Sequence, residues 1–272
     1  MTPIKEGNTM HITITGNLGS GKSTIGKFLS EKYNFEIYST GKIQRELASQ
    51  MNLSTLELNQ LMMSDRKYDH MIDDETTRIS RTYKDKNIIF DSRLAWHFAE
   101  HSFKVFVSVS LDVAADRIIN DQRGSVERYS SVEEAKKLLA ERAKTESIRY
   151  KEIYNLNYMD FSNYNLVIDS TYCNPEIIAE IIIEEARIYY HHSQETSKIL
   201  VSPKRFVFED LKEAEDKKSL DALIKEMEAA VCYKDKVIRV QQQGSDYLVM
   251  DNQDYAKAAF FAGVSYIQIE II

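Results

Sequence analysis

The sequence has little of what marks a flexible linker or a disulfide scaffold. Among its 272 residues there are three prolines, nine glycines and two cysteines. Because glycine and proline are so few, we expect no long linker or low-complexity tract. Cys173 and Cys232 lie far apart and match no metal-binding spacing, so we expect two buried thiols in a reducing compartment.

Long apolar runs are missing as well. The most apolar stretch, residues 177–183, contains Glu180 and falls well short of the about 20 residues needed to cross a bilayer. The first ten residues are polar and hold no apolar signal core. We therefore expect a cytoplasmic protein with no membrane partner.

Positive charge is not in excess either, because the formal net charge is −7. A nucleic-acid partner is not expected, since neutralising a phosphate backbone requires a basic surface. A small anionic substrate needs only a few local cations and stays compatible with this balance. Hydrophobic residues at 43% and charged residues at 28% are typical of a globular protein with a substantial core.

The first two thirds of the chain alternate short β-rich runs with helical stretches. This alternation predicts an α/β fold, a three-layer α/β/α architecture in which helices cover both faces of a parallel five-stranded sheet. The expected strands are residues 11–15, 35–38, 87–91, 104–110 and 166–169.

The pattern changes near His191, where residues 191–198 form a polar connector. We place a domain boundary there, between a first domain of residues 1–192 and a small C-terminal α/β domain of residues 200–272. The expected elements of the second domain are strand 205–208, helix 219–230, strands 237–241 and 247–250, helix 254–262 and strand 266–271.

The strongest local signal follows the first expected strand. Residues 16–23 satisfy G-x-x-x-x-G-K-[ST] between a strand and a helix, which is the arrangement of a P-loop (Walker A). Its glycines let backbone amides point at phosphate oxygens, and the helix N-terminus adds positive potential. Lys22 can bridge the β- and γ-phosphates of ATP and the Ser23 hydroxyl can bind Mg²⁺. The predicted ATP-binding residues are Gly16, Asn17, Gly19, Ser20, Gly21, Lys22, Ser23 and Thr24.

Three further features favour phosphoryl transfer to a small acceptor. Ser39, Gly41 and Arg45 open the helix after the second strand and offer free amides and a guanidinium to a phosphate. Asp91 and Arg93 follow the next strand, at the sheet edge where ligands of open α/β sheets bind. Arginines then gather between residues 117 and 149, where they can close over a triphosphate; they are Arg117, Arg123, Arg128, Arg142 and Arg149.

Each feature also has an ordinary structural explanation. Arg45 can lie on a solvated helix face, and Asp91 can cap a turn. The arginines of residues 117–149 can pair with nearby glutamates; the candidates are Glu127, Glu134, Glu141 and Glu146.

The order and spacing of seven runs between about residue 10 and residue 190 resemble the archaeal-type (type 2) cytidylate kinases. The runs are HITITGNLGSGKST (11–24), YSTGKIQRELA (38–48), DHMID (69–73), IIFDSRLAW (88–96), ADRI (115–118), RYKEIY (149–154) and YNLVIDST (164–171).

This resemblance implies ATP-dependent phosphorylation of CMP, and often dCMP, with Mg²⁺. It assigns acceptor binding to Ser39, Gly41, Arg45, Asp73 and Arg93, and a mobile lid to the region around Arg117–Arg149. The catalytic candidates are Lys22, Asp91, Arg117, Arg123 and Arg149, and Asp91 joins Ser23 as a metal candidate.

The chain departs from the family pattern at two places. Asp91-Ser92-Arg93-Leu94 stands where the family usually has Glu-Gly-Arg-Leu, so a glycine is lost beside the reacting groups. Asp121 occupies the usual place of a second lid arginine, which leaves Arg123 to substitute.

Residues 200–272 resemble the ParB and sulfiredoxin-like fold, through the strand, turn, helix, glycine and strand of residues 246–272. The family's Asp-Gly-x-x-Arg turn here reads Asp251-Asn252-Gln253-Asp254-Tyr255, without the glycine and arginine. We expect a degenerate binding module, or one that forms a homo-oligomer.

Two other functions stay open at this point. One is a kinase of the same fold that acts on another small acceptor. The other is a nucleotide-sensing regulatory protein whose C-terminal tail binds a partner.

Overall fold

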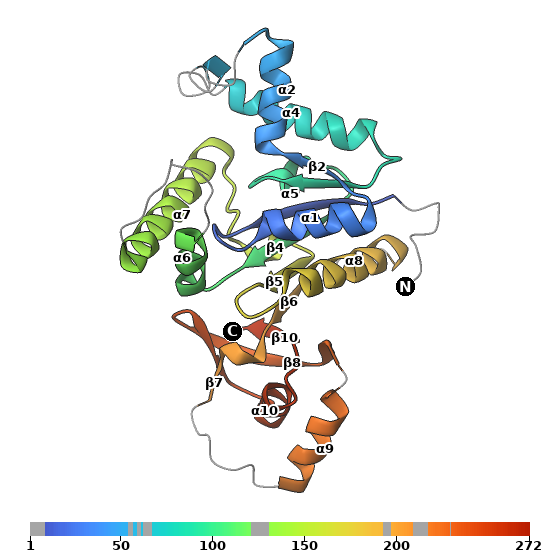
Figure 1. Ribbon diagram of the computed structural model, residues 1–272, viewed down its shortest axis with the longest axis vertical. Coiled ribbons are helices and arrows are strands. Elements are labelled where there is room, and N and C mark those ends of the chain that lie inside the picture. Colours follow the sequence, from blue (N-terminus) through green and yellow to red (C-terminus); the bar gives the residue numbers. More distant parts are fainter. Residues whose placement is uncertain are drawn as a thin grey trace.

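One continuous β-sheet runs through the protein from end to end (Figure 1). The computed structural model describes residues 9–53, 57–58, 61, 67–120, 131–192, 197–208, 217–228 and 230–272. Within these ranges the sheet has ten strands in the order β2-β3-β1-β4-β5-β6-β10-β8-β9-β7.

The first five strands of this order form the parallel sheet that the sequence predicts. β1 pairs with β3 on one side and β4 on the other, while β2 and β5 flank them, all in parallel. The strands are β1 (His11–Gly16), β2 (Glu36–Ser39), β3 (Ile88–Asp91), β4 (Ser102–Ser108) and β5 (Leu166–Asp169). The prediction of an α/β fold with a parallel-rich sheet is confirmed.

Helices cover both faces of this sheet because successive strand side chains point to opposite sides. Ile89 of β3 joins the apolar cluster under α1 and α8, whereas Ile88 and Phe90 join the cluster on the other face, under α2 and α4. The helices of the two layers are α1 (Lys22–Tyr33) and α8 (Pro175–His192) on one face, and α2 (Thr40–Gln50), α4 (Lys67–Thr82) and α5 (Ala95–Phe98) on the other.

Two helices stand off the sheet beside the carboxyl end of β4 (Figure 1). α6 (Leu111–Asn120) and α7 (Val132–Tyr154) pack together through a small apolar cluster that includes Ala115 and Leu139. A short 3₁₀ helix, η1 (Phe161–Asn163), then leads back to β5. The described residues of the predicted lid, around Arg117–Arg149, therefore belong to these two helices.

The C-terminal part continues the sheet of the first part. β6 (Lys198–Val201) pairs in parallel with β5 and antiparallel with β10 (Tyr266–Ile271). We expected residues 191–198 as a connector and no strand before residue 205, so β6 was missed. A lysine followed by three apolar residues is too short a run to show a period, and the pairing with β5 and β10 makes these residues a strand.

The remaining elements form a small sheet-and-helix unit around a second apolar cluster, which includes Ile238, Val240 and Ala258. Its elements are η2 (Pro203–Arg205), β7 (Phe206–Val207), α9 (Lys217–Met227), β8 (Cys232–Gln243), β9 (Asp246–Val249) and α10 (Gln253–Phe261). Residues 198–272 are called the C-terminal unit below. Tyr266 of this unit is fully buried in the cluster beneath α1 and α8. In the described part of the chain, no helix combines the length and apolarity that a membrane span requires.

Candidate nucleotide and acceptor site

The phosphate loop joins β1 to α1 and leaves no room for side chains at two glycines. Gly16 has φ 149°, and a Cβ there would overlap the carbonyl oxygen of Val107 on β4. Gly19 has φ 75°, and a Cβ there would lie 2.8 Å from the carbonyl oxygen of Ala114 on α6. Both positions combine a backbone conformation that favours glycine with a close backbone approach. The loop therefore packs closely against the backbones of β4 and α6.

Two polar side chains of the loop, Ser20 and Lys22, line a common cavity. The Ser20 side chain is buried, and its Oγ has no hydrogen-bond partner. Lys22 Nζ donates to the carbonyl oxygens of Gly16 at 3.1 Å and Asn17 at 2.8 Å. Burial, and secondarily the positive charge of Arg93, lower the pKa of Lys22 to about 7. A buried hydroxyl without a partner and a desolvated ammonium are groups that an anion would satisfy.

A cavity of about 890 Å³ opens along this loop. Its size is within the range of small-molecule sites, which run to about 1,000 Å³. It is lined by residues 18–25 of the loop and α1, by Arg93, by residues 116–118 and Asn120 of α6, and by Ser170, Cys173, Pro175 and Ile178. The last four were not predicted from the sequence, although residues 170–175 follow a parallel strand at its carboxyl end, where ligands bind.

Arg117 on α6 joins the phosphate loop to the segment after β5. Its guanidinium donates to the carbonyl oxygen of Gly19 at 3.3 Å, and to the Ser170 carbonyl and hydroxyl oxygens at 2.7 and 3.2 Å. Arg117, a predicted catalytic residue, lines the same cavity as the phosphate loop. Arg123, the other predicted arginine of this region, lies outside the described residues, as do Arg128, Glu127 and Asp121.

The end of β3 brings Asp91 and Arg93 to the phosphate loop. Asp91 is paired in register with Ile14 of β1 and with Ser39 of β2, so three neighbouring strand ends meet here. The negative charge of Asp91 acts on Lys22 and raises its pKa, against the larger effect of burial. Arg93 donates to the carbonyl oxygen of Gly16 and to Glu146 of α7 at 2.9 Å.

The predicted acceptor residues lie on α2 and α4. Ser39 caps α2, because its hydroxyl accepts a 3.2 Å hydrogen bond from the backbone amide of Lys42. Gly41 follows in the first turn, and Arg45 is exposed one turn later, with its guanidinium near Gly41. Thus Ser39, Gly41 and Arg45 form one group of acceptor candidates at the carboxyl end of β2.

Asp73 on α4 belongs to a second group of contacts, with the end of α7. The Tyr154 hydroxyl donates to its carboxylate at 2.6 Å. Burial raises the pKa of Asp73 to about 6, and the hydrogen bond from Tyr154 opposes this rise. Sequence reasoning had not linked these two residues.

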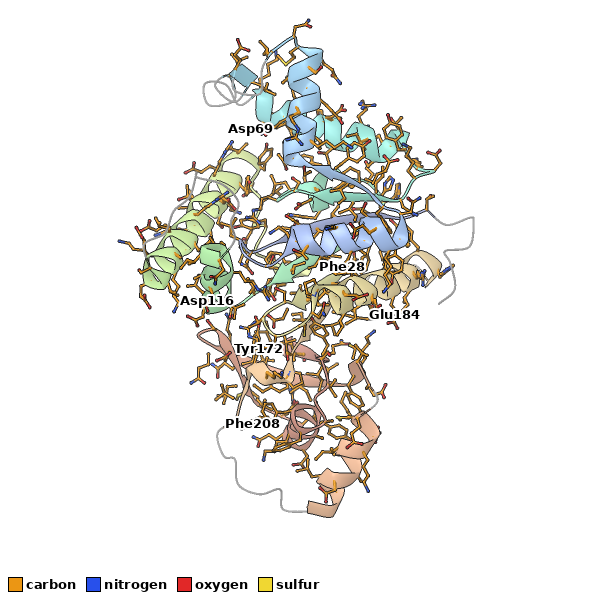
Figure 2. The ribbon with its side chains drawn as sticks, in the orientation of Figure 1. Phe28, Asp69, Asp116, Tyr172, Glu184 and Phe208 are labelled. Carbon is orange, nitrogen blue, oxygen red and sulfur yellow. The ribbon has the colours of Figure 1, made fainter. Side chains whose placement is uncertain are left out.

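The arginines of α7 are engaged with carboxylates. Arg142 pairs with Glu146 at 3.2 Å, as the ordinary explanation of these arginines expected. Arg149, a predicted catalytic residue, instead contacts Asp69 at the start of α4, on the side facing α7 (Figure 2). The structure thus places Arg149 at the junction of α4 and α7.

With this geometry in view, comparison with known proteins decides the family. Residues 11–172, more than half of the chain, match the model of the "Cytidylate kinase-like family". The chain belongs to the cytidylate kinase-like family. The matched residues include the phosphate loop and helices α2, α4, α6 and α7, and they end just after β5.

Curated relatives share the same region. Cytidylate kinase of Methanococcoides burtonii is 34% identical over 173 residues, which are 64% of this chain and 94% of the relative. Cytidylate kinase of Methanosarcina mazei is 37% identical over 164 residues, or 59% of this chain and 87% of the relative. The relatives therefore align over nearly their whole length, and the C-terminal unit is additional to them.

A solved structure shares the fold of the same part. An uncharacterised protein from Eubacterium ventriosum aligns with 66% of this chain and 99% of its own, at TM-score 0.51 and 15% identity. At that identity the likeness concerns the fold alone. It again leaves the C-terminal third unmatched.

Proposed function

We propose that this protein is an ATP-dependent nucleoside monophosphate kinase that phosphorylates CMP, and dCMP, to the diphosphate. The observation that carries the proposal is that the phosphate loop, Asp91 and Ser39 meet at three neighbouring strand ends within a cytidylate kinase-like chain. Cytidylate kinases from archaea align with this part over about nine tenths of their own length. A donor and an acceptor phosphate can therefore meet at one edge of the sheet.

The loop residues fit the phosphates of ATP. Gly16 and Gly19 keep the loop free of side chains, and the unpartnered Ser20 hydroxyl and the Lys22 ammonium supply polar groups. We assign ATP binding to the residues from Gly16 to Thr24 that the motif names, with Arg117 at the same cavity. Lys22 would leave its two carbonyl partners to meet the β- and γ-phosphates.

The chain also offers suitable groups for Mg²⁺. Ser23, in the first turn of α1, and Asp91, at the end of β3, present oxygen donors, the kind that Mg²⁺ prefers. When bound, Mg²⁺ would neutralise charge on the β- and γ-phosphates. The Asp91 carboxylate otherwise supports the charged form of Lys22.

The protein would work by positioning and charge neutralisation, since phosphoryl transfer requires little covalent chemistry from the enzyme. Ser39, Gly41, Arg45, Asp73 and Arg93 would hold the acceptor. For this, Arg93 must exchange Glu146 for a phosphate, which a guanidinium can bind through two nitrogens. Arg117, Arg123 and Arg149 would stabilise the charge that develops during transfer.

We further propose that residues 1–192 are the kinase domain and residues 200–272 a small, degenerate ParB/sulfiredoxin-like domain. Its own apolar cluster and its order of strand, helix, glycine and strand support this. The altered turn lacks the arginine of the family pattern, and its Asp251 pairs with Arg239 at 2.6 Å. Binding of a partner or self-association is the role we propose for it.

A coupled assay of ADP release across nucleoside monophosphates tests the proposed function. We expect turnover with Mg²⁺ and ATP that CMP and dCMP stimulate more than AMP, GMP or UMP do. Turnover with another nucleoside monophosphate, and none with CMP, would identify that nucleotide as the substrate. ATP binding without acceptor-dependent ADP release would identify a nucleotide sensor in place of a kinase.

A further inference from the structure

Residues 169–173, at the end of β5 beside the proposed nucleotide cavity, are in contact with the C-terminal unit. Ser170 and Cys173 of this segment line the cavity, opposite the phosphate loop. Figure 2 shows the neighbouring Tyr172 at the boundary between the two halves of the protein. Three contacts from the C-terminal unit reach this segment.

The first contact is a buried ion pair. Arg205, in η2, donates to Asp169 Oδ1 at 2.7 Å, and the exposed fractions of the two side chains are 5% and 0%. Asp169 Oδ1 also accepts a 2.8 Å hydrogen bond from the Thr171 hydroxyl. Because both charges are removed from water, each offsets part of the desolvation cost of the other, and loss of either partner would leave a buried charge uncompensated. Arg205 therefore holds the carboxyl end of β5 in place.

The second and third contacts come from the start of β10. The hydroxyl of the fully buried Tyr266 donates to the Asp169 carbonyl oxygen at 2.6 Å. The Cys173 thiol contacts the carbonyl oxygen of Ser265 at 3.4 Å. Residues at both ends of the 169–173 segment are thus bonded to the C-terminal unit.

A direct path leads from these contacts to the phosphate loop. Ser170 follows Asp169, and its carbonyl oxygen accepts from Arg117, whose guanidinium also donates to Gly19. Any displacement of Asp169 would move Ser170 and with it the partner of Arg117. The C-terminal unit is therefore coupled to the part of the site that binds the donor nucleotide, on the opposite side from α2 and α4.

We propose that Arg205 and Tyr266 are positioning residues for ATP, which makes the C-terminal unit part of the donor-nucleotide site. This inference rests on the proposed use of ATP. It predicts that weakening these contacts lowers affinity for ATP and leaves the affinity for CMP unchanged, because the proposed acceptor residues lie at the ends of β2 and β3 and on α2 and α4. It also makes the C-terminal unit a place from which a bound partner can change ATP affinity.

The sharpest variant is Tyr266→Phe, which removes one hydroxyl and keeps the buried ring. Tyr233→Phe is the matched control, since its hydroxyl lies in the same unit but contacts Glu226 at 3.5 Å, away from Asp169. Loss of one buried hydrogen bond is expected to raise the Kd for Mg²⁺–ATP, measured by titration calorimetry, about three- to tenfold in Y266F and not in Y233F. The KM for CMP should stay at its wild-type value in both. Amide hydrogen exchange of residues 166–178 in the ligand-free protein should increase only in Y266F.

Two further variants test the Arg205–Asp169 ion pair, so that the inference does not depend on Tyr266→Phe alone. Arg205→Met leaves a buried carboxylate unpaired and is expected to unfold at a lower temperature, whereas Asp169→Asn together with Arg205→Met removes both charges and should recover part of that loss. The double variant should still bind ATP more weakly than the wild type. Unchanged ATP affinity in Y266F and in the double variant, or equal losses for ATP and CMP, would overturn the inference. Failure of the wild type to bind ATP would instead overturn the proposed function itself.

Discussion

Arg149 on α7 and Asp69 on α4 form an ion pair that spans 80 residues of sequence. One guanidinium nitrogen donates to both carboxylate oxygens at 2.9 Å. Arg149 is more than half exposed, whereas the Asp69 side chain is 15% exposed. The pair joins α7 to α4, the helix that carries Asp73, so under the proposed function it connects the donor side of the site to the acceptor side.

Arg149 must leave Asp69 before it can contact a phosphate, so this ion pair is expected to slow catalysis slightly. Partly exposed ion pairs contribute about 0.2–1 kcal/mol. Asp69→Asn should therefore raise kcat about two- to fivefold, whereas Arg149→Ala should lower kcat at least tenfold. Steady-state kinetics with ATP and CMP measures both effects.

Glu100→Gln is the control for this experiment, because Glu100 pairs at 2.6 Å with Arg81 at the other end of α4. It should leave kcat unchanged. A decrease of kcat in D69N similar to that in R149A would show that the ion pair itself belongs to the active arrangement.

Lys22→Ala should abolish most turnover and keep the fold. The hydrogen bonds of Lys22 go to carbonyl oxygens of its own loop, so its removal takes away the proposed phosphate ligand without breaking a bond between distant elements. Loss of one such charged donor is expected to lower kcat about a hundred- to thousandfold. Lys27→Ala on the same helix, where Lys27 pairs with Glu31 at the surface, should leave kcat unchanged. Loss of the circular dichroism spectrum in K22A, or full activity, would contradict this role.

The pH dependence of ATP binding should report the titration of Lys22. Burial lowers the pKa of Lys22 to about 7 in the ligand-free protein, and a bound triphosphate raises that pKa again. Binding then takes up a proton above pH 7, so the Kd for ATP should rise up to tenfold per pH unit above about pH 7 and level off below it. Calorimetry in buffers of different ionisation enthalpy measures the proton directly.

Lys22→Arg provides the control for this pH dependence. A guanidinium keeps its charge over this range, so the variant should bind ATP with no such slope above about pH 7. The same slope in wild type and K22R would assign the proton to another group.

Asp73 should give the acceptor site a pH dependence of its own. Burial raises its pKa to about 6, so the carboxylate is protonated as the pH falls through about 6 and loses an acceptor for the substrate. The KM for CMP should therefore rise in that range. Tyr154→Phe removes the hydrogen bond that favours the carboxylate and should move the midpoint to higher pH.

Two variants check this assignment. Asp73→Asn should have a high KM for CMP at every pH, without the step near pH 6. Tyr150→Phe, on the same helix as Tyr154, should keep the wild-type midpoint. A midpoint that stays in place in Y154F would rule out Asp73 as the titrating group.

Much of the kinase half could be predicted because its signals are local. Gly16, Gly19 and Lys22 lie within seven residues, and the strand-to-loop-to-helix sequence alone determines their backbone path. Asp91 and Arg93 could be placed at the site because parallel strands bring their carboxyl ends to one edge. Arg149 shows where this reasoning stops: the sequence offered Glu146 as a partner for the arginines of this region, which Arg142 does contact, but gave no sign that Arg149 pairs with the distant Asp69.

The sequence by itself determined the phosphate loop, the α/β alternation and the kinship with cytidylate kinases, because glycine conformation, strand period and motif spacing act over a few residues. Only the tertiary structure decided that β6 continues the sheet, that Arg205 and Tyr266 contact Asp169, and that Ser170 lines the cavity beside the phosphate loop. Asp169 is 36 residues from Arg205 and 97 from Tyr266. No local pattern relates residues this far apart, and it is burial in a shared core that brings Asp169 together with Arg205 and Tyr266.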